Sequence, residues 1–184
     1  MQKYLVKRNI FIVLGMVILA EVLWAGWSLV KPTPPSTVAV PVTSQTSISL
    51  SADKSQLRVR ERILVTINVA SAKKVDGVDL IITYDPKLLT AQPTVLGTIF
   101  SDYPQNKVDA TLGRVSVSGI TTQQGGVIPE GQFAAVTFVA KAVGLTKVSL
   151  DFTPGKTGDT NVTETGTGAD ILEKVNQLEI NILP

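Results

Sequence analysis

The clearest pattern in this sequence is an alternation of apolar and polar positions between Gly77 and Tyr84. Because successive side chains of a strand point to opposite faces, the pattern predicts a strand with one buried face and one partly polar face. The expected buried set is Val78, Leu80, Ile82 and Tyr84, and the expected outer set is Asp79, Ile81 and Thr83. Pro86 cannot donate to a strand ladder, so we expect the strand to end there, with Asp85 capping the turn.

Similar short alternations recur from Thr46 to the end of the chain, between turns rich in Gly, Pro, Asn and Asp. A sustained helical period of 3.6 residues is absent from this part of the sequence. The expected strands are centred on residues 48–50, 62–70, 77–84, 95–99, 114–118, 133–141, 147–152 and 178–182. Eight or nine short strands of this kind predict an all-β fold, a jelly-roll β-sandwich.

A different pattern fills residues 10–30, which are almost continuously apolar. A helix of this length, at about 1.5 Å per residue, spans roughly the 30 Å of a hydrocarbon core. Lys3, Lys7 and Arg8 precede it, which places this basic flank in the cytoplasm and the rest of the chain outside. We expect a single-pass signal-anchor in the cell membrane. Glu21 interrupts the span, and a cleaved signal peptide is the alternative that equally exports the remainder.

Residues 31–45 contain four prolines among Ser and Thr, a composition that favours an extended spacer. The sequence therefore predicts an N-terminal helix, a tether and one exported sandwich. The expected boundaries are a basic flank at 1–9, a transmembrane signal-anchor at 10–30, a linker at 31–45 and the sandwich domain at 46–184.

Composition narrows the chemistry of the exported domain. Cysteine and histidine are both absent, which excludes disulfides, thiolate nucleophiles and imidazole catalysis. Carboxylates are present, but no pair stands at a spacing that glycoside hydrolysis would require. The net charge of +2 owes much to the N-terminus, and without a clustered basic patch we expect no nucleic-acid partner. We therefore expect a non-catalytic protein without a cofactor.

Several of the alternating segments together resemble the cohesin domain, the bacterial receptor module that binds dockerins in cellulosomes and on cell surfaces. The resemblance runs through nearly the whole exported domain, and only the ensemble of segments is specific. It is carried by RILVTINVA at 62–70, GVDLIITYDPKLL at 77–89, GTIF at 97–100, GRVSVSGIT at 113–121 and GQFAAVTFVAK at 131–141. It implies a non-catalytic receptor or scaffold for a dockerin-bearing or other secreted protein, with polysaccharide as a further expected partner.

The resemblance also implies a binding site, because cohesins hold a dockerin helix pair on a flat sheet face. The strand that leads into Tyr84-Asp85-Pro86 supplies polar contacts there, which makes Asp79 the matching acidic position. A mixed face with one acid suits a helix carrying Ser, Thr or Lys. The implied partner-binding residues are Asp79, Ile81, Thr83, Arg114, Ser116, Ser118, Thr121 and Gln123. A merely solvated sheet face is the alternative interpretation.

The most polar stretch, residues 151–170, carries an incomplete calcium-loop pattern. Asp159, Asn161, Thr163 and Asp170 fall at positions 1, 3, 5 and 12 of such a loop, but Glu164 stands where the loop needs glycine. We interpret the stretch as a solvated Thr/Gly loop and predict no metal site.

Two other function classes remain open from the sequence. A carbohydrate-binding sandwich would need exposed aromatic rings, and residues 46–184 contain no tryptophan, so Tyr103 is the ring expected to be exposed. A structural surface domain without a specific ligand is the third possibility.

Overall fold

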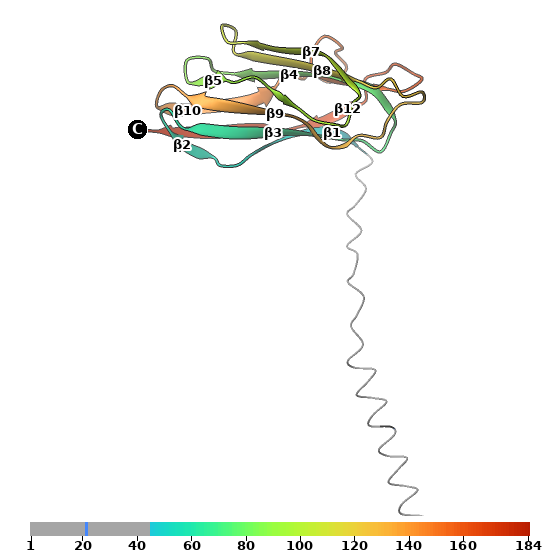
Figure 1. Ribbon diagram of the computed structural model, residues 1–184, viewed down its shortest axis with the longest axis horizontal. Coiled ribbons are helices and arrows are strands. Elements are labelled where there is room, and N and C mark those ends of the chain that lie inside the picture. The colour runs from blue at the N-terminus through green and yellow to red at the C-terminus, as the bar shows by residue number, and fades with distance from the viewer. Residues whose placement is uncertain (1–20, 22–44) are drawn as a thin grey trace, which may run out of the picture. The chain divides into compact units, whose positions relative to one another are not determined.

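The computed structural model describes residues 45–184 and the single residue Glu21 (Figure 1). Apart from Glu21 in the predicted transmembrane segment and Gln45 in the predicted linker, both segments therefore lie outside the described residues. Within the described part, no helix is long and apolar enough to cross a membrane.

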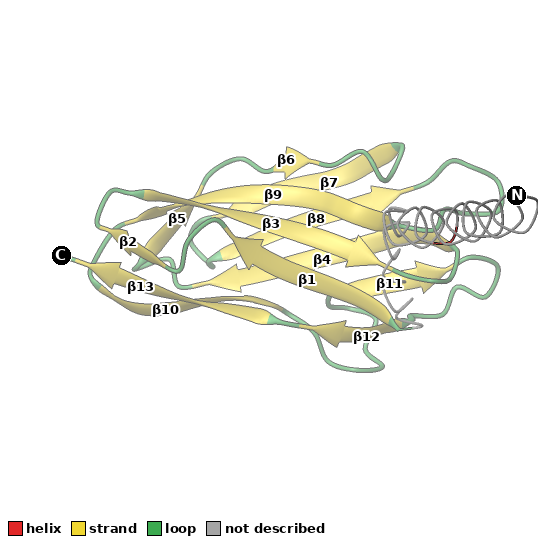
Figure 2. Ribbon diagram, turned by 90° about the horizontal axis from the view of Figure 1, so that it is seen from below, coloured by secondary structure: helices red, strands yellow, loops and turns green. Residues whose placement is uncertain are grey.

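Residues 46–183 form two β-sheets that pack face to face as two layers (Figure 1). Sheet A has the order β12-β1-β3-β9-β5, and β6 also pairs with β9. Sheet B has the order β2-β13-β10-β4-β8-β7, and β11 also pairs with β4. The strands of the two layers lie along roughly the same axis, which is the aligned packing of a β-sandwich (Figure 2).

The strand bounds are as follows. Sheet A contains β1 (Thr46–Ala52), β3 (Arg62–Ala70), β5 (Leu89–Ala91), β6 (Val95–Leu96), β9 (Glu130–Ala140) and β12 (Leu172–Val175). Sheet B contains β2 (Gln56–Arg58), β4 (Val75–Tyr84), β7 (Asp102–Asp109), β8 (Arg114–Ile120), β10 (Gly144–Leu150), β11 (Asn161–Glu164) and β13 (Gln177–Leu183).

The prediction of an all-β sandwich is confirmed, but the predicted number of eight or nine strands is wrong. The structure has 13 strands. Four of the unexpected ones, β2, β5, β11 and β12, have three or four residues each, too few to display an alternation. The fifth, β7, is long, but it is polar and contains Pro104, features of an edge strand.

The alternation in β4 divides its side chains between core and surface as predicted. Val78, Leu80, Ile82 and Tyr84 are all buried, and Asp79 on the opposite face is exposed. The turn after β4 also matches its prediction, since Asp85 Oδ1 accepts a hydrogen bond from the Lys87 amide at 2.8 Å. One hydrophobic core, drawn entirely from residues 48–182, fills the space between the sheets. The sandwich is therefore an independent folding unit.

One segment of sheet B leaves the sheet and returns to it. β10 and β11 pair with the same edge of β4, β10 at Ile82–Tyr84 and β11 at Val75–Asp79. Between them, residues 152–159 form an excursion that begins and ends beside Ile81. We call this excursion the 152–159 loop.

The solvated-loop interpretation of residues 151–170 is wrong for residues 159–162. Asp159, Thr160, Asn161 and Val162 are all buried, with relative exposures of 6%, 0%, 7% and 0%. The burial arises because β11 pairs with β4. β11 could not be recognised from the sequence, because its side chains are mostly polar and the strand has only four residues.

Candidate partner-binding groove

The outer face of sheet B carries its side chains in cross-strand rows. Directly paired residues of neighbouring strands face the same way, so the pairing register defines each row. The first row is Gln105, Ser118, Asp79 and Asn161, the second is Lys107, Ser116 and Ile81, and the third is Asp109, Arg114, Thr83 and Ser149. Five strands thus assemble one mixed polar surface.

A tight hairpin fixes β7 against β8 at one end of this face. Gly113, the last residue of the turn, has a φ of +64°, a conformation that glycine adopts without strain. A Cβ at this position would lie 2.2 Å from the Tyr84 carbonyl oxygen, so no side chain fits. The Asp109 carboxylate closes the turn by accepting hydrogen bonds from the amides of Thr111 and Leu112 at 3.1 and 3.0 Å.

The 152–159 loop forms a wall beside the face. It is attached to β4 at Ile81, whose amide donates to Thr160 Oγ1 at 3.0 Å. The Thr160 hydroxyl in turn donates to the Ile81 carbonyl at 3.2 Å, and the Asp151 amide donates to the same carbonyl at 2.8 Å. The Thr160 amide donates to the Asp151 carbonyl at 2.8 Å, which closes the base of the loop.

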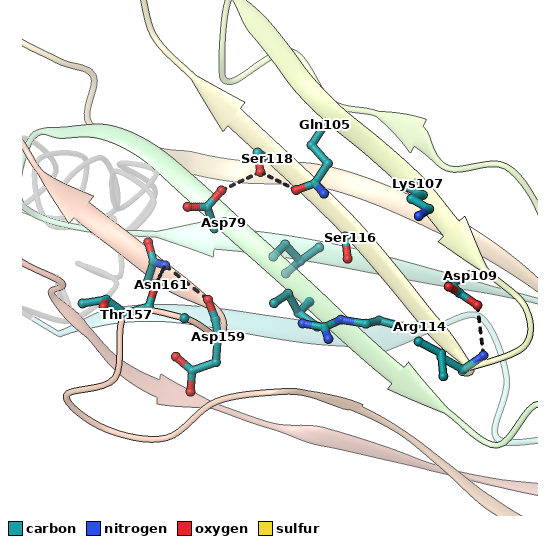
Figure 3. Close-up of a pocket in the computed structure, with 14 residues that line it drawn as sticks. Asp79, Gln105, Lys107, Asp109, Arg114, Ser116, Ser118, Thr157, Asp159 and Asn161 are labelled. Carbon is teal, nitrogen blue, oxygen red and sulfur yellow. Dashed lines mark hydrogen bonds between the residues drawn. The ribbon is translucent and has the colours of Figure 1, made fainter.

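Floor and wall together enclose an open groove of about 480 Å³ (Figure 3). β4, β8 and β7 form the floor, residues 157–159 form the wall, and Leu112 of the hairpin turn closes one end with 71% of its surface exposed. The half-buried Ile81 adds apolar surface to the floor. The groove therefore offers hydroxyls, amides and charges around a small apolar centre.

A hydrogen-bond chain orders the first row. Ser118 Oγ donates to Asp79 Oδ1, and the same Oγ lies 3.1 Å from the side-chain amide of Gln105 (Figure 3). A hydroxyl has one proton, and here Asp79 receives it, so the amide completes the chain when its NH₂ group points at Ser118. Asp79 is thereby held in one orientation while remaining exposed to a partner.

The charges that line the groove are Asp79, Asp109 and Asp159 against Lys107 and Arg114, an excess of one negative charge. Arg114 also lies 3.9 Å from Asp151, at the base of the 152–159 loop. Groups of both signs on one face suit a partner that itself carries both signs.

The structure brings most of the predicted site residues together. Asp79, Ile81, Arg114, Ser116 and Ser118 all line the groove. Thr83 lies on the same face beyond the groove, where its hydroxyl lies 3.1 Å from that of Ser149.

Thr121 and Gln123 are not in the groove. β8 ends at Ile120, and a turn follows whose residues do not line the groove. The Thr121 hydroxyl shapes this turn by accepting a hydrogen bond from the Gln123 amide at 3.0 Å.

The prediction missed the whole contribution of β7 and of the wall. The residues concerned are Gln105, Lys107, Asp109, Leu112, Thr157, Gly158, Asp159 and Asn161. One signal for β7 was present, since a short turn that ends in Gly113 and opens an alternating strand implies a partner strand before it.

The calcium-loop residues take other roles. Asp170 Oδ1 accepts hydrogen bonds from the amides of Val162 and Leu172, both at 3.0 Å, and Thr163 pairs with Gly77 in the sheet. Asp159 Oδ2 accepts from the Thr153 amide at 2.6 Å. These oxygens therefore do not converge on one point. Among the described residues, no group of three or more Asp, Glu, His or Cys side chains could hold a metal ion.

Comparisons with solved structures agree with this architecture. A type II cohesin domain from the cellulosome of Acetivibrio cellulolyticus is 21% identical with a TM-score of 0.62, covering 74% of this chain and 95% of that chain. The sixth cohesin of Acetivibrio cellulolyticus scaffoldin B, in complex with a mutant Cel5 dockerin, is 20% identical with a TM-score of 0.59, covering 76% of this chain and 99% of that chain. A type I Coh-OlpA–Doc918 complex from Clostridium thermocellum is 13% identical with a TM-score of 0.57, covering 74% of this chain and 99% of that chain. At these identities the likeness establishes the fold.

Sequence comparison supplies the family. A search of curated protein sequences found no significant match. A family model of the cohesin domain, however, matches residues 48–182, which include nearly all of both sheets. Cohesin domains are non-catalytic protein–protein interaction modules, so this match also confirms the expectation that the chain is not an enzyme. The chain belongs to the cohesin domain family.

Proposed function

We propose that this chain is a cell-surface receptor that captures a dockerin-bearing secreted protein in the groove of sheet B. The observation that carries the proposal is the continuous polar face of β7, β8 and β4 in a cohesin domain, with Asp79 held ready but exposed. Two of the similar solved structures are complexes with dockerins, which supports the same class of partner for this chain.

The face is built to receive a rigid partner. Its floor consists of paired strands rather than loops, so little conformational entropy is lost when a partner binds. Ser116 and Ser118 are short, and they allow a helix to approach the sheet closely while their hydroxyls hydrogen-bond to it. Ile81 and Leu112 supply the apolar contact that specific interfaces place among polar groups.

Within residues 45–184 no aromatic side chain is exposed, which counts against the alternative of carbohydrate binding. Stacking of sugars requires exposed aromatic rings, and Phe100, Phe133 and Phe138 are at most 5% exposed. Tyr103, the ring expected to be exposed, packs instead against Phe100 and Phe133, with ring centroids 6.4 and 5.5 Å away. Its hydroxyl donates to the Phe133 carbonyl at 3.2 Å, which uses its polar end inside the domain.

The proposal includes the membrane location expected from the sequence. The apolar run at residues 10–30 would anchor the chain, and the proline-rich residues 31–45 would hold the sandwich away from the bilayer. Extraction of membranes with alkaline carbonate tests this part. Release of the full-length chain into the soluble fraction would contradict the anchor.

A capture experiment tests the binding function. Residues 45–184 are immobilised and exposed to the secreted proteins of the source organism, with calcium or with EGTA, and bound proteins are identified by mass spectrometry. Dockerins need calcium, so we expect capture of a dockerin-bearing protein that EGTA abolishes. Capture that is equal in EGTA, or no capture at all, would contradict the proposal.

A matched pair of variants locates the interaction. Ser116→Arg places a long charged side chain at the centre of the groove, and Ser51→Arg places the same side chain on an exposed position of β1 in the other sheet. We expect Ser116→Arg to weaken capture at least about tenfold, equivalent to roughly 1.4 kcal/mol, and Ser51→Arg to have no effect. Equal capture by Ser116→Arg and Ser51→Arg would contradict binding of the partner in the groove.

A further inference from the structure

The charged side chains of the groove differ in exposure: Asp109 and Arg114 are half-buried and Asp159 is buried. Asp109 closes the β7–β8 turn, Asp159 accepts from the Thr153 amide, and Arg114 lies near Asp151. Asp79 and Lys107 are both exposed; Asp79 accepts a hydrogen bond from the Ser118 hydroxyl, but neither residue forms an ion pair within the part of the chain that the structure describes. These two charges, of opposite sign, are therefore the ones available to a partner.

The sheet sets the separation of the two charges. Lys107 lies on β7 and Asp79 on β4, with β8 between them, so two strand spacings separate them sideways. Lys107 pairs with Ser116 and Asp79 with Ser118, so the two also differ by two residues along the strands. Strand spacings of about 4.8 Å and a rise of about 3.4 Å per residue place their Cα atoms roughly 12 Å apart.

Small side chains occupy the diagonal between them. Ser118 and Ser116 lie between Asp79 and Lys107 in the close-up (Figure 3). Neither serine is long enough to keep a helix away from the sheet. A helix lying on this diagonal would rise about 12 Å over eight residues, and residues seven or eight apart share one face.

We infer that Asp79 and Lys107 act as two charge anchors that select the sequence and the direction of the bound dockerin helix. The helix that fits presents Lys or Arg to Asp79 and Asp or Glu to Lys107, about eight residues apart. For a given order of the two charges along the helix, binding in the reverse direction sets like charges against each other and is rejected. This inference rests on the proposed function and names the partner chemistry at the same site.

Selection from a displayed library tests the inference. The library consists of calcium-loaded dockerin modules whose exposed helix positions carry Lys, Glu, Ser or Ala, and the bait is residues 45–184. The bait variants are Asp79→Lys, Lys107→Glu and the double variant that exchanges both charges. Glu173→Lys, an exposed position on β12 in sheet A, is the matched control. Thermal unfolding of each bait verifies that these surface changes leave the fold intact.

The wild-type and Glu173→Lys baits are expected to enrich modules with a base and an acid about eight residues apart. Asp79→Lys should replace the selected base by an acid and so enrich two acids, Lys107→Glu should replace the selected acid by a base and so enrich two bases, and the double variant should again enrich one base and one acid. Against the wild-type helix, each single variant should bind about tenfold more weakly or worse. Single variants that select the same charges as wild type would overturn the inference and leave the proposed function standing. A wild-type bait that enriches no module would overturn the proposed function and the inference with it.

Discussion

The hydroxyl of Thr160 should hold the wall of the groove to its floor, and removing it should destabilise the domain measurably. Thr160 is fully buried, and its Oγ1 exchanges two hydrogen bonds with the backbone of Ile81. In Thr160→Val the Ile81 carbonyl keeps its bond from the Asp151 amide, but the Ile81 amide loses its partner. An unpaired backbone donor of this kind costs about 1–3 kcal/mol of the free energy of unfolding.

The same substitution at Thr146 provides a matched control in the same sheet. Thr146 is 5% exposed, and its buried hydroxyl has no hydrogen-bond partner in the described structure. Thr146→Val replaces a buried unsatisfied hydroxyl by a methyl group, so we expect a neutral or stabilising effect of up to about 1 kcal/mol. The two threonine-to-valine changes should therefore differ by roughly 1–4 kcal/mol.

Urea denaturation of residues 45–184 measures both effects. The free energy of unfolding is obtained by linear extrapolation, and an unchanged m-value shows that the two-state comparison is valid. Equal destabilisation by Thr160→Val and Thr146→Val would refute the reasoning, since it would show that loss of a hydroxyl, rather than loss of the Ile81 contacts, decides the result.

Two further predictions concern Gly97 and the Lys73–Glu164 ion pair, which lie outside the groove lining. Gly97→Ala should lower the free energy of unfolding by more than about 3 kcal/mol or prevent folding, because its Cβ would lie 2.0 Å from the Gln132 carbonyl oxygen. The control Gly158→Ala, whose Cβ would have no atom within 4 Å, should change the free energy of unfolding by less than about 0.5 kcal/mol. Urea denaturation compares the two variants, and similar values would contradict the packing at Gly97. The Lys73 ammonium, 2.9 Å from Glu164, and the Thr167 hydroxyl lower the pKa of the Glu164 carboxyl from its ordinary 4.5. The Lys73–Glu164 ion pair therefore stabilises the fold fully above pH 4.5, and this stabilisation is lost as the pH falls through the lower pKa of Glu164 in the folded state. Lys73→Met should accordingly be less stable than wild type at pH 7 and equally stable in strong acid. Lys74→Met should match wild type at both pH values, and a Lys73→Met deficit that persists in acid would argue against the ion pair.

Much of the fold could be predicted because the core strands have long alternations. β3, β4 and β8 each alternate over at least seven residues, and burial follows the pattern. The short strands β2, β5, β11 and β12 could not be predicted, because three or four residues carry too little periodic signal and their pairing depends on distant parts of the chain.

The site was predictable only where it lies on such strands. Asp79 and Ser118 follow from the outer positions of β4 and β8. Lys107 and Asn161 could not be found in this way, because β7 and β11 lack an apolar face that would mark them as strands, and only the three-dimensional pairing brings them to the groove. Thr121 lies outside the groove for the converse reason, since the sequence alone did not show that β8 ends at Ile120.

Hydrogen–deuterium exchange of the complex tests most directly the claim that the sheet B face captures the partner. Residues 45–184 are compared free and bound to the calcium-loaded dockerin module that they capture. The account predicts slower exchange in the bound state for amides of β7, the β7–β8 turn and the 152–159 loop, with β1 and β12 of sheet A unchanged. Protection confined to β1 and β12, with the amides around the groove exchanging as in the free domain, would contradict it.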